Sequence, residues 1–286
     1  DTNRTSSALK NCNLTVHIST KPNRSHLVTG KTGLILPCLG RTEEDISKIA
    51  GKQFVTVENS MGIVHSSTGT FKPASGKLIS EPAIVSGIAG ALESRLERSG
   101  LPWKNLSDNY NLIRELIENT IPGFEDYNIR IKSKSGFYLP NPPRDSRTFK
   151  TKNGLANFIS SDITYAKSSD KFMMMTIRSH DQYNTTIYGL DDRYRGIKNG
   201  RRVVLMNNND IVNLGLSKGS MVDLCSEMNS GQVVSPRWFV VPYEIPEGNV
   251  ATYFPESNIL IPLDSVADRS NTPTSKSVPI SITKSS

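Results

Sequence analysis

The stretch that decides the fold covers residues 175–224, MTIRSHDQYNTTIYGLDDRYRGIKNGRRVVLMNNNDIVNLGLSKGSMVDL. Short apolar runs alternate there with polar loops rich in Gly and Asn, a pattern typical of short strands. One short helix is predicted over NDIVNLGL, residues 209–216. The strand-like runs in and around this stretch are FMMMTIR (172–178), RRVVLM (201–206), SMVDLCS (220–226), WFVVPYEI (238–245) and PISI (279–282). Several short strands with a single short helix favour a barrel over a sandwich.

Toward the amino terminus the pattern changes to mixed strand and helix. LTVHI (14–18) predicts a short strand, and GLILP (33–37) is a continuous apolar run typical of buried parallel strands. QFVTVEN (53–59) alternates and predicts another strand. A helix is predicted from its N-cap Ser80 onward. Its apolar face holds Ile84, Val85, Ile88, Ala89, Leu92 and Leu96. These elements indicate an α/β piece that is too short for a complete doubly wound domain.

Residues 101–167 differ in character from both flanking parts. One helix is predicted over NYNLIRELIENTI (109–121), and the Pro122–Gly123 pair ends it. The following segment, GFYLPNPPRDSRTF (136–149), is rich in proline and polar residues. This composition predicts a connecting excursion, so the chain is divided into an α/β part (1–100), the excursion (101–167) and the β part (168–286).

The chain of 286 residues carries a formal net charge of +7, which suits partners that bear phosphate. No long basic run concentrates this charge, and Arg201 and Arg202 lie in the densest local cluster. A diffuse basic surface is explained by solvation alone, with a phosphate-lined groove as the competing explanation. No stretch approaches the roughly 20 apolar residues that a membrane-spanning helix needs.

The three cysteines, Cys12, Cys38 and Cys225, lie far apart and form no CxxC pair. A structural zinc site or an iron–sulfur cluster needs about four grouped ligands, so this chain is expected to hold neither. Cys38 and Cys225 stand in apolar runs and are expected to be buried. An odd number of cysteines without a disulfide framework indicates a cytoplasmic protein.

Three segments resemble the C-terminal portion of the molybdopterin-dependent oxidoreductases of the formate dehydrogenase type. These segments are residues 16–45, 175–224 and 244–276. The first is similar to the family's third domain, the second to the opening of its fourth domain, and the last to that domain's final loops. The resemblance implies a fragment of a Rossmann-like domain followed by a mainly β double-psi barrel. In the family these two domains hold a pair of molybdopterin guanine dinucleotides, which hold molybdenum or tungsten.

The resemblance also implies cofactor-binding residues on the loop after the first barrel strand. Arg178 matches the family's arginine there, and His180 would lie near the pterin beside Asp181. The further positions implied are Gln182, Tyr183, Asn184, Thr185, Tyr253 and Asn258. Their chemistry is suitable, because arginine offers a bidentate fork to a pyrophosphate and amide side chains can both donate and accept. The competing explanation is an ordinary polar loop of caps and turns.

The resemblance places the metal ligand and any iron–sulfur cluster in upstream domains, so no catalytic residue and no metal ligand is assigned here. The chain alone is expected to be inactive, with those upstream domains and a small-molecule substrate as its partners. HLVTGK (26–31) and VTVENSMGIVH (55–65) depart from the family's usual elements near the metal, so the resemblance does not extend to formate as substrate. Arg24 and His26 would line an anion funnel or be solvated loop residues.

Two other functions fit parts of the sequence. One is a basic barrel that binds single-stranded nucleic acid, which would need aromatic platforms interleaved with cations. The residues that outline such a surface are Tyr183, Tyr188, Tyr194, Arg193, Arg195 and Arg201. The other is an assembly domain without a cofactor. The cofactor-binding interpretation predicts neither nucleic acid nor a membrane segment.

Overall fold

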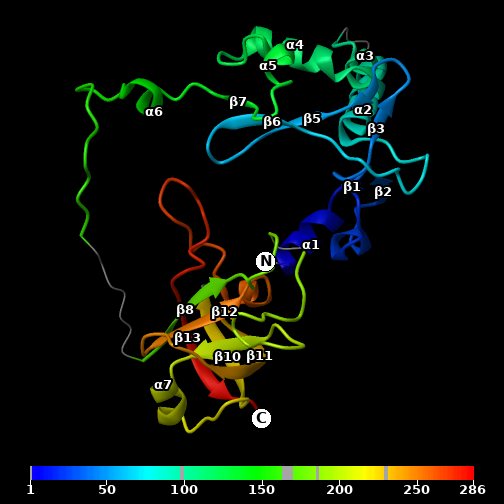
Figure 1. Cartoon of the computed structure of the whole chain (residues 1–286). Coiled ribbons are helices and arrows are strands. Elements are labelled where there is room, and N and C mark those ends of the chain that lie inside the picture. Colours follow the sequence, from blue (N-terminus) through cyan, green and yellow to red (C-terminus); the bar gives the residue numbers. More distant parts are fainter. Residues whose placement is uncertain (1, 97–99, 163–169, 185–186, 229–230) are drawn as a thin grey trace. The chain divides into compact units, whose positions relative to one another are not determined.

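The computed structural model describes residues 2–96, 100–162, 170–184, 187–228 and 231–286. The chain forms two compact units (Figure 1). The barrel unit comprises Ser161–Ser286 together with Asp1–Thr5, and the α/β unit comprises Ser6–Ser160. A helix, α1 (Thr2–Lys10), begins the chain. Among the described residues, no helix combines the length and the apolar composition that crossing a bilayer requires.

The barrel unit is a closed sheet with the strand order β10-β11-β9-β12-β8-β13. Its strands are β8 (Phe172–Ile177), β9 (Val203–Met206), β10 (Met221–Met228), β11 (Gly231–Pro242), β12 (Asn249–Tyr253) and β13 (Val278–Lys284). Two neighbouring pairs, β8–β12 and β9–β11, are parallel, and the other four are antiparallel. The expected barrel is therefore confirmed.

Alternate residues of the barrel strands fill its interior, as the two-residue period of a strand requires. Met174 on β8, Val204 on β9 and Trp238 on β11 are all fully buried. The predicted short helix is α7 (Asn208–Asn213), capped by Asn207, whose side chain accepts from the Asn209 amide. A 3-10 helix, η2 (Glu256–Leu260), follows β12 and buries Leu260 in the same interior.

β12 was not among the predicted strands. Its sequence, NVATY, contains Asn and Thr instead of a continuous apolar run. Nevertheless, four of its five residues are buried, because β12 lies between β8 and β9 in the closed sheet. Thr252 is fully buried and Tyr253 is 1% exposed. Closure of the barrel thus buries polar residues that a hydropathy pattern cannot identify.

The α/β unit begins with two parallel strands, β1 (Leu14–Ser19) and β2 (Thr32–Pro37), joined through the 3-10 helix η1 (Arg24–Leu27). Their parallel pairing agrees with the sequence prediction, but β2 is mostly exposed instead of buried. The predicted helix is α2 (Glu81–Arg95), with Ser80 as its N-cap. Of its apolar face only Ile84 is buried, while Val85, Ile88, Leu92 and Leu96 are exposed.

The rest of this unit is built from small antiparallel sheets and short helices. QFVTVEN does not form a single strand, because its first residue belongs to the β3–β4 pair and residues 55–58 belong to a three-stranded sheet. The strands are β3 (Asp45–Ser47), β4 (Gly51–Gln53), β5 (Val55–Glu58), β6 (Ile63–Ser67) and β7 (Phe137–Tyr138). The helices are α3 (Trp103–Asp108), α4 (Tyr110–Thr120), α5 (Tyr127–Arg130) and α6 (Pro142–Ser146).

The expected connecting excursion differs from what the structure contains. β7 pairs with β6, and Tyr127, Ile131 and Phe137 form one buried cluster with Val64. Residues 101–138 thus contribute to the core of the α/β unit instead of linking two domains. The Pro-rich composition of residues 136–149 is typical of a segment that connects two domains. The helices before this segment, however, already belong to the α/β unit. The division between the units falls after Ser160.

The barrel core gives a direct test of the strand register. Replacing Met174, which is 0% exposed, with alanine should lower the free energy of unfolding of the barrel by about 2–5 kcal/mol through lost burial and a cavity. The neighbouring substitution Met175→Ala, at a side chain 39% exposed, should cost less than about 1 kcal/mol. Urea unfolding followed by the fluorescence of Trp238, in a Trp103→Phe background, measures both values. Equal costs would contradict the register.

Candidate functional site

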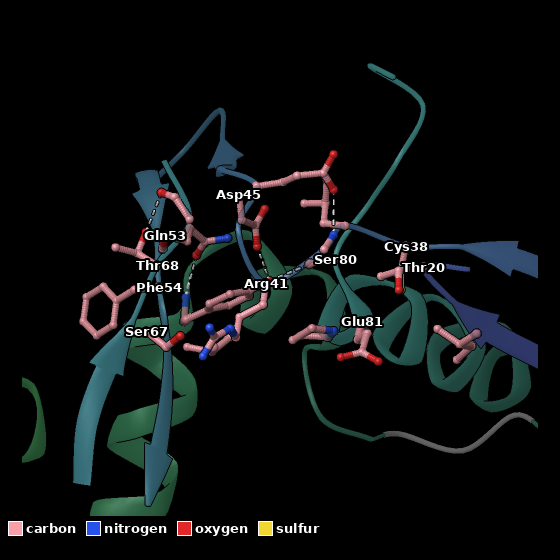
Figure 2. Close-up of a pocket in the computed structure, with 18 of the residues that line it drawn as sticks. Thr20, Cys38, Arg41, Asp45, Gln53, Phe54, Ser67, Thr68, Ser80 and Glu81 are labelled. Carbon is pink, nitrogen blue, oxygen red and sulfur yellow. Dashed lines mark hydrogen bonds between the residues drawn. The ribbon is translucent and has the colours of Figure 1, made fainter. Parts of the chain in front are cut away.

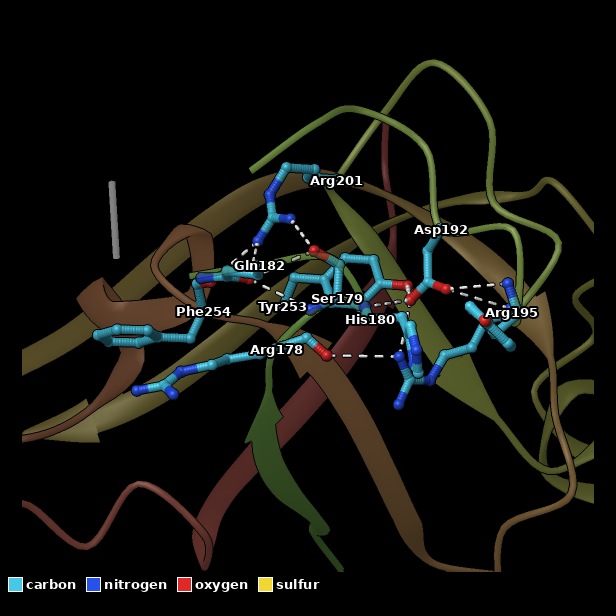
Figure 3. Close-up of polar contacts among 10 residues, drawn as sticks. Arg178, Ser179, His180, Gln182, Asp192, Arg195, Arg201, Tyr253 and Phe254 are labelled. Atoms are coloured by element: carbon cyan, nitrogen blue, oxygen red, sulfur yellow. Dashed lines mark hydrogen bonds and ion pairs between the residues drawn. The ribbon is translucent and has the colours of Figure 1, made fainter. Parts of the chain in front are cut away.

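The candidate site is the polar loop that leaves the barrel after β8, residues 178–184. Ile177 at the end of β8 pairs with Tyr253 at the end of β12, and the Phe254 amide donates to the Ile177 carbonyl at 2.8 Å. The segments after these two parallel strands therefore begin side by side at one end of the barrel. β9 starts at the same end, because it runs antiparallel to β12 and pairs Val204 with Thr252. Three segments distant in sequence thus meet at the loop (Figure 3).

Arg201, just before β9, connects the first two of these segments. It is 4% exposed, and its Nη1 donates to Ser179 Oγ at 2.7 Å and its Nη2 to Gln182 Oε1 at 2.8 Å. The same Nη2 donates to the Phe254 carbonyl at 2.9 Å, while Nε donates to Glu256 Oε1 at 2.7 Å. The guanidinium also lies 3.9 Å from the Tyr188 ring centroid. One buried cation thus holds both loops.

Asp192 holds the same two segments through an anion. Its carboxylate is 1% exposed and accepts from the Tyr253 hydroxyl at 2.8 Å and from the His180 amide at 3.3 Å. Arg195 Nη1 donates to it at 2.7 Å and also donates to the Arg178 carbonyl at 3.3 Å. The backbone at Arg178 and His180 is therefore fixed by Asp192 and its arginine partner.

Electrostatics keep this cluster in one protonation state near neutral pH. Burial opposes the charge on Asp192, but hydrogen bonds from Tyr253 and Arg195 and the charge of Arg195 outweigh it and lower the pKa of the carboxyl. Burial, followed by the hydrogen bond to Asp192, raises the pKa of Tyr253. Tyr253 therefore stays a donor and Asp192 an acceptor throughout the physiological range.

Two of the predicted cofactor-binding residues have partners within the protein. Gln182 Nε2 donates to the carbonyls of Asn184 and Phe254, and its Oε1 accepts from Arg201 and from the Ser179 amide. All the polar capacity of that amide is thus used. The Tyr253 hydroxyl is bonded to Asp192, and its ring is buried. In this conformation both side chains shape the loop instead of offering polar groups to a ligand.

The other predicted residues lie at the surface of the same loops. Arg178 is exposed, and no described residue accepts a hydrogen bond from its guanidinium. Figure 3 shows it extended toward the Phe254 ring and away from Asp192. Tyr183 is 67% exposed, Asn184 has a left-handed backbone with φ of 51°, and Asn258 is half-buried on η2. Thr185 falls outside the described residues.

His180 was expected to form an electrostatic pair with Asp181, but its contacts are different. Its exposed ring stacks on Tyr194, with 3.7 Å between the ring centroids, and its amide donates to Asp192. Sequence reasoning did not identify Asp192 at all, and it noted Arg201 only as part of a basic cluster and of the possible nucleic-acid surface. Neither residue carried a signal of burial, because each lies beside a similar residue that is exposed (Asp191 and Arg202).

The three tyrosines considered for base stacking all lie at the surface, with exposures of 67% for Tyr183, 38% for Tyr188 and 60% for Tyr194. Two of these rings have partners within the protein, because Arg201 lies over Tyr188 and His180 lies against Tyr194. Arg195 and Arg201 are each paired with a carboxylate. Two of the three arginines considered for this surface are therefore engaged within the protein.

The α/β unit has a cavity of its own, of about 480 Å³ (Figure 2). It lies where β1 and β2 end, because Ser19, Thr20 and Cys38 line it, and the first turn of α2 closes one side. Ser80 Oγ lies 2.5 Å from Tyr110 Oη, and that hydroxyl donates to Asp45 Oδ2 at 2.5 Å. Tyr110 is buried, and burial together with Asp45 raises the pKa of its hydroxyl.

Arg41 is the cation in the lining of this cavity, and no described residue accepts a hydrogen bond from it. Arg24 and His26, expected as a possible anion funnel, are not among the lining residues. His26 instead completes a capping box with Asn23 and stacks on His17, with 4.8 Å between ring centroids. In the described part of the chain, no three His, Cys, Asp or Glu side chains group as metal ligands would. Cys38 and Cys225 are buried as expected.

These features define a class of protein. A closed barrel presents a polar loop whose buried charges are paired within the protein, while the guanidinium of Arg178 has no partner among the described residues. Residues 172–279, most of the barrel unit, match the family model described as Molydopterin dinucleotide binding domain. The barrel unit is therefore similar to that family of domains.

Similar proteins extend over both units. The chain is 48% identical over 284 residues to an uncharacterized oxidoreductase of Mycobacterium tuberculosis. The aligned region covers 97% of this chain and 36% of that protein. The chain is 43% identical over 282 residues to the protein YdeP of Escherichia coli, spanning 96% of this chain and 36% of YdeP. The chain thus spans about a third of the length of the curated relatives it matches.

Among solved structures, the acetylene hydratase from Pelobacter acetylenicus superposes with a TM-score of 0.55 and 15% sequence identity. The match covers 87% of this chain and 38% of that one. At this level of identity the likeness concerns the fold alone.

The buried carboxylate predicts an acid-sensitive barrel. The pKa of Asp192 is lower in the folded than in the unfolded protein. The ionised carboxylate therefore stabilises the fold above about pH 4, and this stabilisation is lost as the pH falls through the pKa of the folded state. Asp192→Asn should cost about 1–3 kcal/mol at pH 7 and remove this part of the acid dependence. The free energy of unfolding by urea, followed by the fluorescence of Trp238 between pH 3 and 7, measures this acid dependence. The control is Asp191→Asn, at an exposed carboxylate. An unchanged acid dependence in Asp192→Asn would contradict the assignment.

Proposed function

We propose that this barrel holds a molybdopterin guanine dinucleotide, within a molybdenum or tungsten oxidoreductase of the formate dehydrogenase type. The observation that carries the proposal is the exposed guanidinium of Arg178, whose loop is held by two other arginines, Arg195 and Arg201, that are paired with carboxylates. The match of residues 172–279 to the dinucleotide-binding family model supports it for the barrel. The two parallel strand pairs in the closed sheet support a double-psi topology.

The residues available at the loop suit a dinucleotide. A pyrophosphate is best bound by charge-assisted donors, which Arg178 supplies in a planar fork. Asn184 and Asn258 offer amides that can donate and accept at the edges of a pterin or guanine ring. Tyr183 offers an exposed ring to stack on, and Thr185 would add a hydroxyl. Gln182 and Tyr253 would support these groups from behind, and His180 would contribute its exposed ring.

In the α/β unit, the cavity is a candidate for a second nucleotide. Ligands of parallel α/β sheets bind at the carboxyl ends of the strands, near helix N-termini. The cavity has this position relative to β1, β2 and α2. Arg41 is the cation of its lining, which also holds the carboxylates Glu43, Asp45 and Glu81. We infer from this that residues 6–160 form part of a Rossmann-like domain whose remaining strands lie elsewhere in a longer protein.

The whole enzyme would depend on residues outside this chain. When bound, the cofactor supplies two-electron redox chemistry at its metal. The metal ligand and any iron–sulfur cluster would lie in the other two-thirds of a protein as long as the relatives, so this chain alone would be inactive. The proposed enzyme would act on a small-molecule substrate in the cytoplasm. Formate is not assigned as that substrate.

Neutralising the free guanidinium tests the proposal. In the full-length protein, Arg178→Gln should lower retained molybdopterin by about tenfold or more, since a charge-assisted pair contributes about 1.5–3 kcal/mol. Lys218→Gln removes one positive charge from an exposed turn after α7 and should leave retention unchanged. Pterin released by oxidation and quantified by fluorescence, after washing at several salt concentrations, measures retention.

The outcomes separate the alternatives. Wild-type protein without pterin would contradict the proposal and favour an assembly domain. Retention of pterin that is equal in Arg178→Gln and wild type would contradict the role of Arg178. Retention on single-stranded DNA with a steep salt dependence would favour the nucleic-acid function instead.

A further inference from the structure

We propose that Arg201 and Asp192 are positioning residues that set the ligand-binding loop from two sides without touching the ligand. This inference rests on the proposed function for its ligand, but its structural part can be tested without one. Both side chains are buried, at 4% and 1% exposure, so neither presents a polar group at the surface.

The two residues act on neighbouring positions of both loops. Arg201 binds the Ser179 hydroxyl, whereas Asp192 accepts from the amide of the next residue, His180. On the second segment Asp192 accepts from the Tyr253 hydroxyl, whereas Arg201 donates to the carbonyl of the next residue, Phe254. Opposite charges therefore hold adjacent residues of the same two loops. A shift of either loop breaks hydrogen bonds to both charged groups.

The charges of these two residues are neutralised inside the protein. Glu256 Oε1 lies 2.7 Å from Arg201 Nε, and Arg195 Nη1 lies 2.7 Å from Asp192 Oδ2. Arg201 and Asp192 also hydrogen-bond to groups of the two segments, which compensates in part for desolvation of their charges. The field that an approaching anion meets at this loop therefore comes from Arg178 and not from the buried pairs.

The same contacts place Arg178 without engaging it. Arg195 donates to the Arg178 carbonyl at 3.3 Å, and the following residue, Ser179, is held by Arg201. The chain is thus held directly after the Arg178 side chain, while its guanidinium keeps its donors for a ligand. Preorganisation of this kind raises affinity by removing the entropy cost of ordering the loop on binding.

The adjacent residue Arg202 provides a matched control. Its Nη2 donates to Ser235 Oγ at 2.9 Å and to the Pro236 carbonyl at 2.7 Å, and its guanidinium lies 5.1 Å from the Trp238 ring centroid. Arg202 thus stabilises β11, and its side-chain hydrogen bonds go to that strand and not to the described residues of the loop. Arg201 and Arg202 have the same charge and neighbouring positions but different partners.

Hydrogen exchange of the 286-residue chain tests the structural part. Lysine cannot reproduce a planar fork with several fixed donors. In Arg201→Lys, amides in residues 179–184 and 254–258 should exchange about tenfold faster or more, while those of the barrel core near Met174 change little. Ser179→Ala removes one contact with little risk to folding, and should accelerate the same two segments to a smaller degree. Arg202→Lys should leave both segments at wild-type rates.

The results expected and excluded are distinct. Acceleration of both segments by Arg201→Lys or Ser179→Ala, with a stable core, supports the inference. Acceleration of one segment alone, no acceleration, or equal acceleration by Arg202→Lys would overturn it. If Arg201→Lys fails to fold, Ser179→Ala alone decides.

Salt dependence distinguishes positioning from direct contact in the full-length protein. Arg178→Gln should lower pterin retention and also reduce its sensitivity to salt, because an exposed charge contact is lost. Arg201→Lys should lower retention by several-fold with the salt sensitivity of wild type. A reduced salt sensitivity in Arg201→Lys would make Arg201 a direct ligand and overturn the inference. Wild-type protein without pterin would refute the proposed function and leave the exchange result standing.

Discussion

The structure of the candidate site depends on one buried ion pair, Arg201 with Glu256. The buried guanidinium just before β9 is tolerated because its donors are hydrogen-bonded, because a carboxylate neutralises it and because it lies over the Tyr188 ring. Its remaining donors reach Ser179, Gln182 and Phe254, so the loops after β8 and β12 share one anchor. Without this pair, the two segments would lose the anchor that adds to the hydrogen bonds they make to Asp192.

Rigidity and availability are divided between different arginines in this arrangement. Arg195 and Arg201 form ion pairs within the protein and hold the loop in place. Arg195 bonds only the carbonyl of Arg178, so the guanidinium of Arg178 remains free to bind a ligand. If Arg195 and Arg201 did not hold the loop of residues 178–184, ordering that loop around an anion would carry a larger entropic cost. The division explains how a chain with a diffuse net charge of +7 can still present one defined anion contact.

The sequence predicted what depends on local patterns and missed what depends on closure of the fold. The barrel, the helix capped by Ser80, the helix at residues 109–121 and the parallel β1–β2 pair all follow from periodicity and capping. β12, with Asn and Thr in its sequence, is a strand only because neighbours flank it on both sides. At the candidate site, the sequence predicted a polar loop after the first barrel strand, but the burial of Asp192 and Arg201 comes from contacts across 61 and 55 residues.

The central claim is that Arg178 contacts the pyrophosphate of a dinucleotide held by the barrel. An experimental structure of the full-length protein, purified from cells supplied with molybdate, tests it most directly. The account predicts dinucleotide density against the loop of residues 178–184, with the Arg178 guanidinium at hydrogen-bonding distance from a phosphate oxygen and with Arg201 still bonded to Ser179 and Glu256. Dinucleotide density that leaves Arg178 without contact, or a loop without a dinucleotide in an otherwise loaded enzyme, would contradict it.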